Sequence, residues 1–73
     1  MTVDLKTLGK ICQEFRRTHG LSQTKAAFDT HYSIENISAF ERGRNDNARI
    51  LLWYIAHGLT VDELKRGGVD FGL

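Results

Sequence analysis

The chain carries few side chains that could act as nucleophiles or metal ligands. Cys12 is the single cysteine, and the three histidines, His19, His31 and His57, are far apart in the sequence. This spacing fits neither a zinc site nor a nucleophile with a nearby base, since both need their groups in a recognisable pattern. We therefore expect no catalytic residue, no metal, no cofactor and no enzymatic activity.

Positive charge gathers in one short segment. Arg42, Arg44 and Arg49 are interleaved with Asn45 and Asn47 between two apolar stretches. The guanidinium groups of arginine and the side-chain amides of asparagine donate hydrogen bonds to phosphate and sugar oxygens. Arginine-rich loops are also common as plain solvated surface, so the prediction of a phosphate contact depends on the elements beside this loop.

Length and composition limit the kind of protein. A chain of 73 residues, 41% apolar and 26% charged, can form one domain with a modest core. The lone cysteine cannot form an internal disulfide, so regular helix packing must provide the stability, and a reducing, cytoplasmic setting is expected. No stretch is long enough to span a bilayer and the N-terminus does not resemble a signal peptide, so we expect no membrane partner. The net charge of +1 is low for a protein that binds nucleic acid.

Apolar periodicity and capping residues predict an all-α fold of five helices. Ser22 and Ser33 are suitable N-caps for two short helices, and Gly20 ends the helix before them. Thr60 and Glu63 have the spacing of a capping box, which starts the last helix. The predicted helices cover residues 4–18, 23–29, 34–42, 48–57 and 60–64. Residue 47 is an alternative start of the fourth helix.

The inward positions of these helices predict the core. They are Leu8, Cys12, Phe15, Leu21, Ala27, Ile37, Phe40, Leu51 and Ile55. The fourth helix contains seven consecutive apolar residues, 50–56, which cover its whole circumference, and so small a domain cannot bury every face of it. Unless a partner protein covers them, some of the following residues should stay exposed: Ile50, Leu52, Trp53 and Tyr54. We expect residues 1–66 to form the domain and 67–73 a flexible C-terminal tail.

Two short helices joined by a tight turn, after a longer helix and before two more, are the layout that offers the second short helix to the DNA major groove. The segments 21–27 (LSQTKAA) and 37–43 (ISAFERG) resemble the helix-turn-helix family of phage repressors and Cro proteins, and the spacing between them matches without a gap. The resemblance covers most of the chain. It implies a five-helix, lambda-repressor-like domain with a central helix-turn-helix.

The resemblance also implies contacts with double-stranded DNA. Gln23 would lie against the phosphate backbone at the start of its helix, where free backbone amides favour an anion, and Lys25 is a weaker candidate. Exposed positions at the start of the helix over 34–42, and one turn further on, would face the groove. They are Ser33, Ile34, Glu35, Asn36, Ser38 and Ala39.

Two sets of charged residues would support this helix. Arg42, Arg44 and Arg49 would grip the sugar–phosphate backbone beside it. The family commonly pairs an arginine late in its first helix with the glutamate that ends the recognition helix. Arg16 and Glu41 occupy these positions, and we expect them to form a close ion pair.

The reading helix departs from its relatives at three positions, since Ile34, Glu35 and Ala39 stand where Gln, Arg, Lys or Ser is frequent. Asn36 can pair with adenine, Glu35 can accept from cytosine N4, and Ile34 or Ala39 can touch a thymine methyl. Glu35 also repels phosphate, and it serves equally well as a plain solvated helix residue.

Two functions therefore stay open. The first is a DNA-binding transcriptional regulator that acts as a homodimer on a repeated half-site. The alternative is a repressor-like protein-interaction module that binds another transcriptional regulator, in the manner of phage modulators or antirepressors. Near-neutral charge, Glu35 and surplus apolar surface favour the alternative, whose contacts would be Ile34, Leu52, Trp53 and Tyr54.

Overall fold

Five α-helices and no strand make up the part of the chain that the structure, a computed structural model, describes: residues 4–71. This confirms the predicted all-α class and the number of helices. The helices are α1 (Leu5–Thr18), α2 (Gln23–Thr30), α3 (Ile34–Glu41), α4 (Ala48–Ala56) and α5 (Val61–Arg66). Within residues 4–71, no helix combines the length and the hydrophobicity that crossing a membrane requires.

Every helix begins after a side chain that accepts hydrogen bonds from free backbone amides. The five capping residues are Asp4, Ser22, Ser33, Asn47 and Thr60. At α5 the Thr60 hydroxyl accepts from the Glu63 N–H at 3.1 Å, while the Glu63 carboxylate accepts from the Thr60 N–H at 2.9 Å. These two hydrogen bonds confirm the predicted capping box. They satisfy backbone amides that would otherwise lack a partner.

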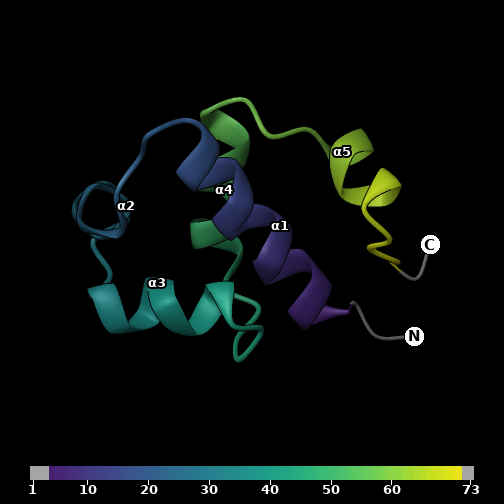
Figure 1. Ribbon diagram of the computed structural model, residues 1–73. Coiled ribbons are helices and arrows are strands. Elements are labelled where there is room, and N and C mark those ends of the chain that lie inside the picture. Colours follow the sequence, from purple (N-terminus) through teal and green to yellow (C-terminus); the bar gives the residue numbers. More distant parts are fainter. Residues whose placement is uncertain (1–3, 72–73) are drawn as a thin grey trace.

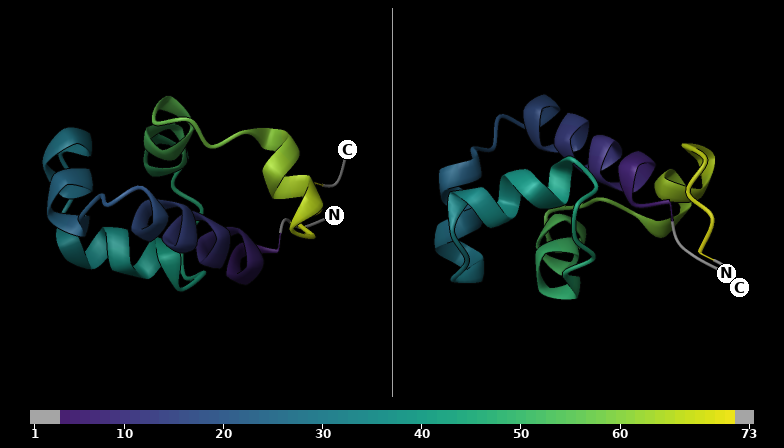
Figure 2. Two further views of the ribbon diagram at one scale, coloured as in Figure 1. Left: turned by 45° about the horizontal axis from the view of Figure 1, so that its top comes forward. Right: turned by 90° about the horizontal axis from the view of Figure 1, so that it is seen from below.

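The helices are arranged around α1, which packs on α3 and α4. α2 packs on α3 and α4 as well, so these four helices enclose most of the core. α5, whose Leu64 is also buried in the core, lies at the other end of the molecule from α2 (Figures 1 and 2). Gly9 permits the approach of α1 to α3, since a Cβ there would lie 2.4 Å from the carbonyl oxygen of Phe40. The backbones of the two helices are therefore in direct contact.

The core contains five of the predicted residues as buried side chains. They are Cys12, Ile37 and Phe40, which are at most 1% exposed, and Leu8 and Phe15, which are buried with 4% and 8% of their area exposed. Leu21 and Ala27 are half-buried and pack against it. The prediction omitted several buried residues, and those are Ala26, Ile50, Trp53, Tyr54, Leu59, Leu64 and Val69.

α4 buries a different face from the predicted one. Trp53 and Tyr54 point inward, whereas Leu51 and Ile55, predicted as core, are only half-buried. Both inward side chains have a polar end with an acceptor: the Trp53 indole N–H donates to Asp29 Oδ2 at 2.9 Å, and the Tyr54 hydroxyl donates to Glu41. Large aromatic side chains can be buried at little cost when their polar atoms are hydrogen-bonded.

The chain after α5 folds back onto the core. Val69 is 5% exposed, and its N–H donates to the carbonyl oxygen of Leu64 at 3.0 Å, while Phe71 packs against the core. The segment predicted as a flexible tail is thus packed as far as Phe71. Residues 1–3 and 72–73 of the predicted domain and tail lie outside the described residues.

Candidate functional site

The start of α3 presents most of the side chains predicted to contact bases. Exposed together are Ser33, Ile34, Glu35 and Asn36. One turn further on, Ser38 and Ala39 are half-buried. The Ser33 hydroxyl accepts from the Asn36 N–H at 3.2 Å and can still donate outward. The first turn of α3 is therefore a polar surface with one apolar residue, Ile34, which keeps 44% of its area exposed.

The loop after α3 is held against that helix. Gly43 has a φ of +76°, and a Cβ at this position would lie 2.6 Å from the Lys6 Cα, so a larger residue would be strained and would clash with α1. Asn45 donates from Nδ2 to the carbonyl oxygen of Asn36 at 3.4 Å, and its Oδ1 accepts from the Asn47 N–H at 3.2 Å. The loop is thus tied to the first turn of α3.

Three exposed arginines follow the first turn of α3 along the chain. Arg42 is the C-cap of α3 and Arg44 lies in the loop, and neither forms an ion pair with another residue of the described part. Arg49 lies in the first turn of α4, with its guanidinium carbon 6.0 Å from the ring centroid of Tyr32. Tyr32 belongs to the turn between α2 and α3. The arginine cluster and the start of α3 are therefore joined by contacts at Asn45 and Tyr32.

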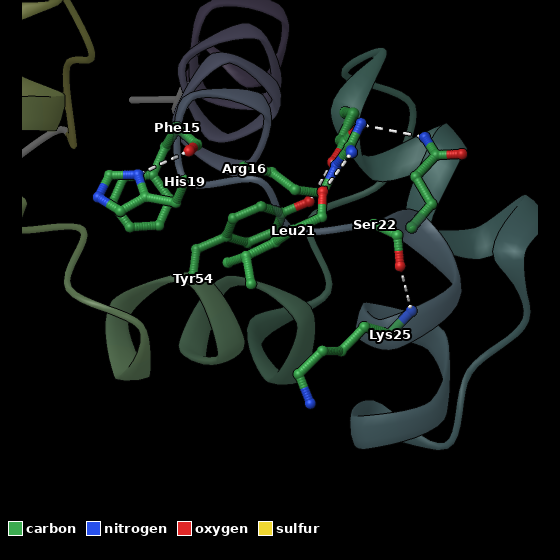
Figure 3. A network of polar contacts seen from close by, with 9 residues as sticks. Phe15, Arg16, His19, Leu21, Ser22, Lys25 and Tyr54 are labelled. Atoms are coloured by element: carbon green, nitrogen blue, oxygen red, sulfur yellow. Dashed lines mark hydrogen bonds and ion pairs between the residues drawn. The ribbon is translucent and has the colours of Figure 1, made fainter.

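Glu41, the last residue of α3, joins this helix to three others. Arg16 donates to it from Nε at 2.7 Å and from Nη2 at 3.1 Å, which confirms the predicted ion pair. Gln23 donates from Nε2 at 3.1 Å, and the Tyr54 hydroxyl donates to the second carboxylate oxygen. Figure 3 shows the Tyr54 side chain reaching from α4 towards Arg16. Both members of the ion pair are buried, with side chains 9% and 0% exposed.

The environment of Glu41 keeps it ionised. Burial raises the pKa of Glu41, but the hydrogen bonds from Arg16, Tyr54 and Gln23 together outweigh burial and hold the pKa below its usual range. The hydrogen bond to Glu41 raises the pKa of Arg16, and burial followed by the bond to Glu41 raises the pKa of Tyr54. At neutral pH the Glu41 carboxylate therefore accepts hydrogen bonds from the charged guanidinium of Arg16 and the neutral phenol of Tyr54. Its chemistry is that of a fixed anchor for α3.

Two side chains predicted to contact phosphate are engaged within the protein. Gln23 uses one amide N–H for Glu41, which holds its side chain at the start of α2 and leaves its second N–H available. Lys25 Nζ lies 3.3 Å from Asp29 Oδ2, the same atom that accepts from Trp53. Lys25 therefore approaches the side of α2 that faces α4, although half of its side chain is exposed.

The apolar residues of the alternative function divide into two pairs. Trp53 and Tyr54 are buried and hydrogen-bonded, so they cannot anchor a partner in this conformation. Leu52 is 60% exposed and Ile34 is partly exposed, so these two remain. The sequence analysis missed Phe28, which is 80% exposed on α2. Phe28 lies about 200° round the helix from Ala26, but only the structure identifies Ala26 as the inward residue, since the sequence predicted Ala27.

Cys12 is fully buried on α1, and burial raises the pKa of its thiol to about 12. It is therefore a core side chain, as the apolar stripe of α1 predicted. Among the described residues no group of histidine, cysteine and acidic side chains is placed to hold a metal ion. No protein family, curated protein or solved structure matches the chain. The candidate site is accordingly defined by its own residues: the start of α3, the loop after it and Arg49.

Proposed function

We propose that the chain is a DNA-binding transcriptional regulator of the phage repressor and Cro type, with α3 as the helix that enters the major groove. α2, the turn after it and α3 would form the helix-turn-helix of a lambda-repressor-like domain. One observation carries the proposal: α3 exposes its first turn while its last residue, Glu41, is locked to α1, α2 and α4. A helix that reads bases must be both free on one face and rigidly placed.

Contacts in the proposed complex divide into positioning and reading. Arg42, Arg44 and Arg49 supply guanidinium groups for phosphates on one side of α3, and the start of α2 with Gln23 supplies amide donors on the other. Bases are read by Asn36, which can pair with adenine, and by neighbours whose methyl groups can touch thymine. Phosphate contacts set register and affinity, and base contacts set sequence preference.

The overall charge of the chain makes a second copy useful. With a net charge of +1, one domain attracts DNA only through its local arginine cluster. Two copies on a repeated half-site would double the number of phosphate contacts, with the two reading helices about one helical turn of DNA apart. We therefore propose a homodimer as the DNA-bound form.

The dependence of DNA binding on salt tests this function. The purified protein is titrated into a fluorescent duplex at several salt concentrations, and the slope of log affinity against log salt is compared between wild type and Arg42→Ala/Arg44→Ala. Each lost phosphate contact should flatten the slope by about 0.9. Lys65→Ala/Arg66→Ala is the matched control, because it removes the same charge from α5, which lies away from α2 and from the first turn of α3 (Figure 1). A folded protein with no affinity for any duplex at low salt would refute the proposal.

A second function is favoured by exposed apolar side chains. Phe28, Leu52 and Ile34 lie on three different helices and are 80%, 60% and 44% exposed. Exposed apolar side chains can bury their area against a partner protein, which would be another transcriptional regulator. In this case Ile34→Ser or Leu52→Ser should abolish binding of a candidate regulator, while Arg42→Ala/Arg44→Ala should leave it unchanged.

A further inference from the structure

The structure assigns to Tyr32 the role of a positioning residue, which holds the guanidinium of Arg49 in place for contact with a phosphate of the DNA backbone. The inference rests on the DNA-binding function proposed above and adds a residue to its site. The observation behind it is the placement of the Arg49 guanidinium over the Tyr32 ring, 6.0 Å from the ring centroid.

The positive charge of Arg49 does not stabilise the helix in which it lies. Arg49 lies in the first turn of α4, where the aligned peptide dipoles repel a cation. No acidic side chain of the described residues forms an ion pair with it. Arg42 differs, because it lies at the C-terminal end of α3, where the same dipole effect favours a cation. A phosphate bound from outside would pair with this cation and would also be favoured by the N-terminal end of α4.

The Tyr32 ring is a suitable platform. It is half-buried and packs against the hydrophobic core, so the ring itself is fixed. A guanidinium stacked on an aromatic face uses only its own face for the contact, and its N–H groups at the edge stay free to donate. Two of those N–H groups match the geometry of two phosphate oxygens. A cation–π contact of this kind restrains Arg49 without consuming the donors that a phosphate needs.

The backbone under Arg49 is fixed as well. The Asn47 side chain accepts from the Arg49 N–H at 3.0 Å and from the Ile50 N–H at 3.3 Å. Asn45 links the same loop to the backbone of α3. Both the main chain and the side chain of Arg49 are thus placed relative to the reading helix, which reduces the conformational entropy that binding would cost.

A double-mutant cycle on DNA binding tests the role of Tyr32. Affinity for a duplex at low salt is measured for wild type, Tyr32→Leu, Arg49→Ala and the double variant. Tyr32→Leu should weaken binding about two- to five-fold, the factor that corresponds to one exposed cation–π contact. In the Arg49→Ala background the same change should have no effect. Equal weakening in both backgrounds would overturn the inference, because Tyr32 would then act through folding or through DNA itself.

Tyr32→Phe is the matched control, since it keeps the ring and removes only the hydroxyl. It should bind DNA like wild type, and a loss as large as that of Tyr32→Leu would overturn the inference. A readout without DNA comes from NMR: ring-current shifts of the Arg49 side-chain protons should be present in wild type and Tyr32→Phe and absent in Tyr32→Leu. If wild type binds DNA but Arg49→Ala leaves the salt slope unchanged, the inference alone fails. If folded wild type binds no DNA, the proposed function fails too.

Discussion

The guanidinium of Arg16 and the carboxylate of Glu41 form a two-pronged ion pair between α1 and α3, with N–O distances of 2.7 and 3.1 Å. A third nitrogen of Arg16 donates to the carbonyl oxygen of Leu21 at 2.9 Å, in the link between α1 and α2. Gln23 and Tyr54 complete the set around the carboxylate. Since Glu41 ends α3, these bonds determine the direction in which the first turn of that helix faces.

Glu41→Gln should destabilise the fold by about 3–5 kcal/mol, because it leaves the buried guanidinium of Arg16 without its counter-charge. Urea unfolding followed by circular dichroism measures the effect. Glu14→Gln is the control: Glu14 is exposed on α1 and forms no ion pair among the described residues, so its change should stay within about 0.5 kcal/mol. Equal effects of the two substitutions would show that the buried pair does not hold α3.

Stability should fall in acid as Glu41 becomes protonated. Its pKa in the folded protein lies below the value of about 4.3 for an unfolded chain, so the folded state binds fewer protons. The resulting stabilisation is complete above about pH 4.3 and is lost as the pH falls through the folded pKa. An NMR titration of the Glu41 side-chain carboxyl carbon checks the sign directly. A midpoint at or above about 4.3 would contradict the prediction.

The helix starts could be predicted because capping is local. Ser22, Ser33 and Thr60 each accept from an amide three residues later, and that pattern is visible in the sequence. The inward face of α4 could not be predicted in this way. Seven consecutive apolar residues have no periodicity, and the choice of Trp53 and Tyr54 depends on Asp29 and Glu41, acceptors far away in the chain.

The candidate site could be predicted where the resemblance to phage repressors gave a register, and could not be predicted elsewhere. Register placed Arg16 opposite Glu41, and the structure confirms the pair. The Tyr32 contact with Arg49 joins residues 17 positions apart through a turn and a loop, and no spacing rule indicates it. The bond from Gln23 to Glu41 depends on the angle between α2 and α3, which the packing of the whole core determines.

Two phenylalanines offer a matched test of the core. Phe40 is 1% exposed, and its ring stacks on Tyr54 with centroids 5.9 Å apart, whereas Phe28 is 80% exposed. Phe40→Ala should cost about 3–5 kcal/mol, which is enough to unfold a domain of this size. Phe28→Ala should change the free energy of unfolding by at most about 0.5 kcal/mol. Thermal unfolding compares the two, and a large loss with Phe28→Ala would mean that a second molecule covers that side chain.

Cys12 should react with thiol reagents only when the domain opens. Its side chain is fully buried, and burial raises the pKa to about 12, so almost no thiolate forms near neutral pH. Labelling with a chromogenic disulfide at about pH 8 should be slow in native buffer and fast in denaturant, since an unfolded cysteine has a pKa near 8.5. Fast labelling of the native protein would remove Cys12 from the core.

Glu35→Gln separates the two proposed functions by its effect on the affinity for DNA. Glu35 is exposed in the first turn of α3, where its charge would face the phosphates that flank the groove. Removing a like charge there should strengthen binding to any duplex at low salt about two- to five-fold. If Glu35 also accepts a hydrogen bond from cytosine, the variant should lose preference for the sequence that carries it.

Glu14→Gln is again the control, because it makes the same change in net charge away from the first turn of α3. Glu14 lies five residues after Gly9, which faces α3, and so about 140° round α1 from that contact. The affinity of the Glu14→Gln variant for DNA should stay close to that of wild type. Equal gains from both variants would indicate a response to net charge alone. No gain from Glu35→Gln, together with loss of regulator binding in Ile34→Ser, would favour the protein-interaction module, because α3 would then present its apolar residue to a protein rather than its polar face to DNA.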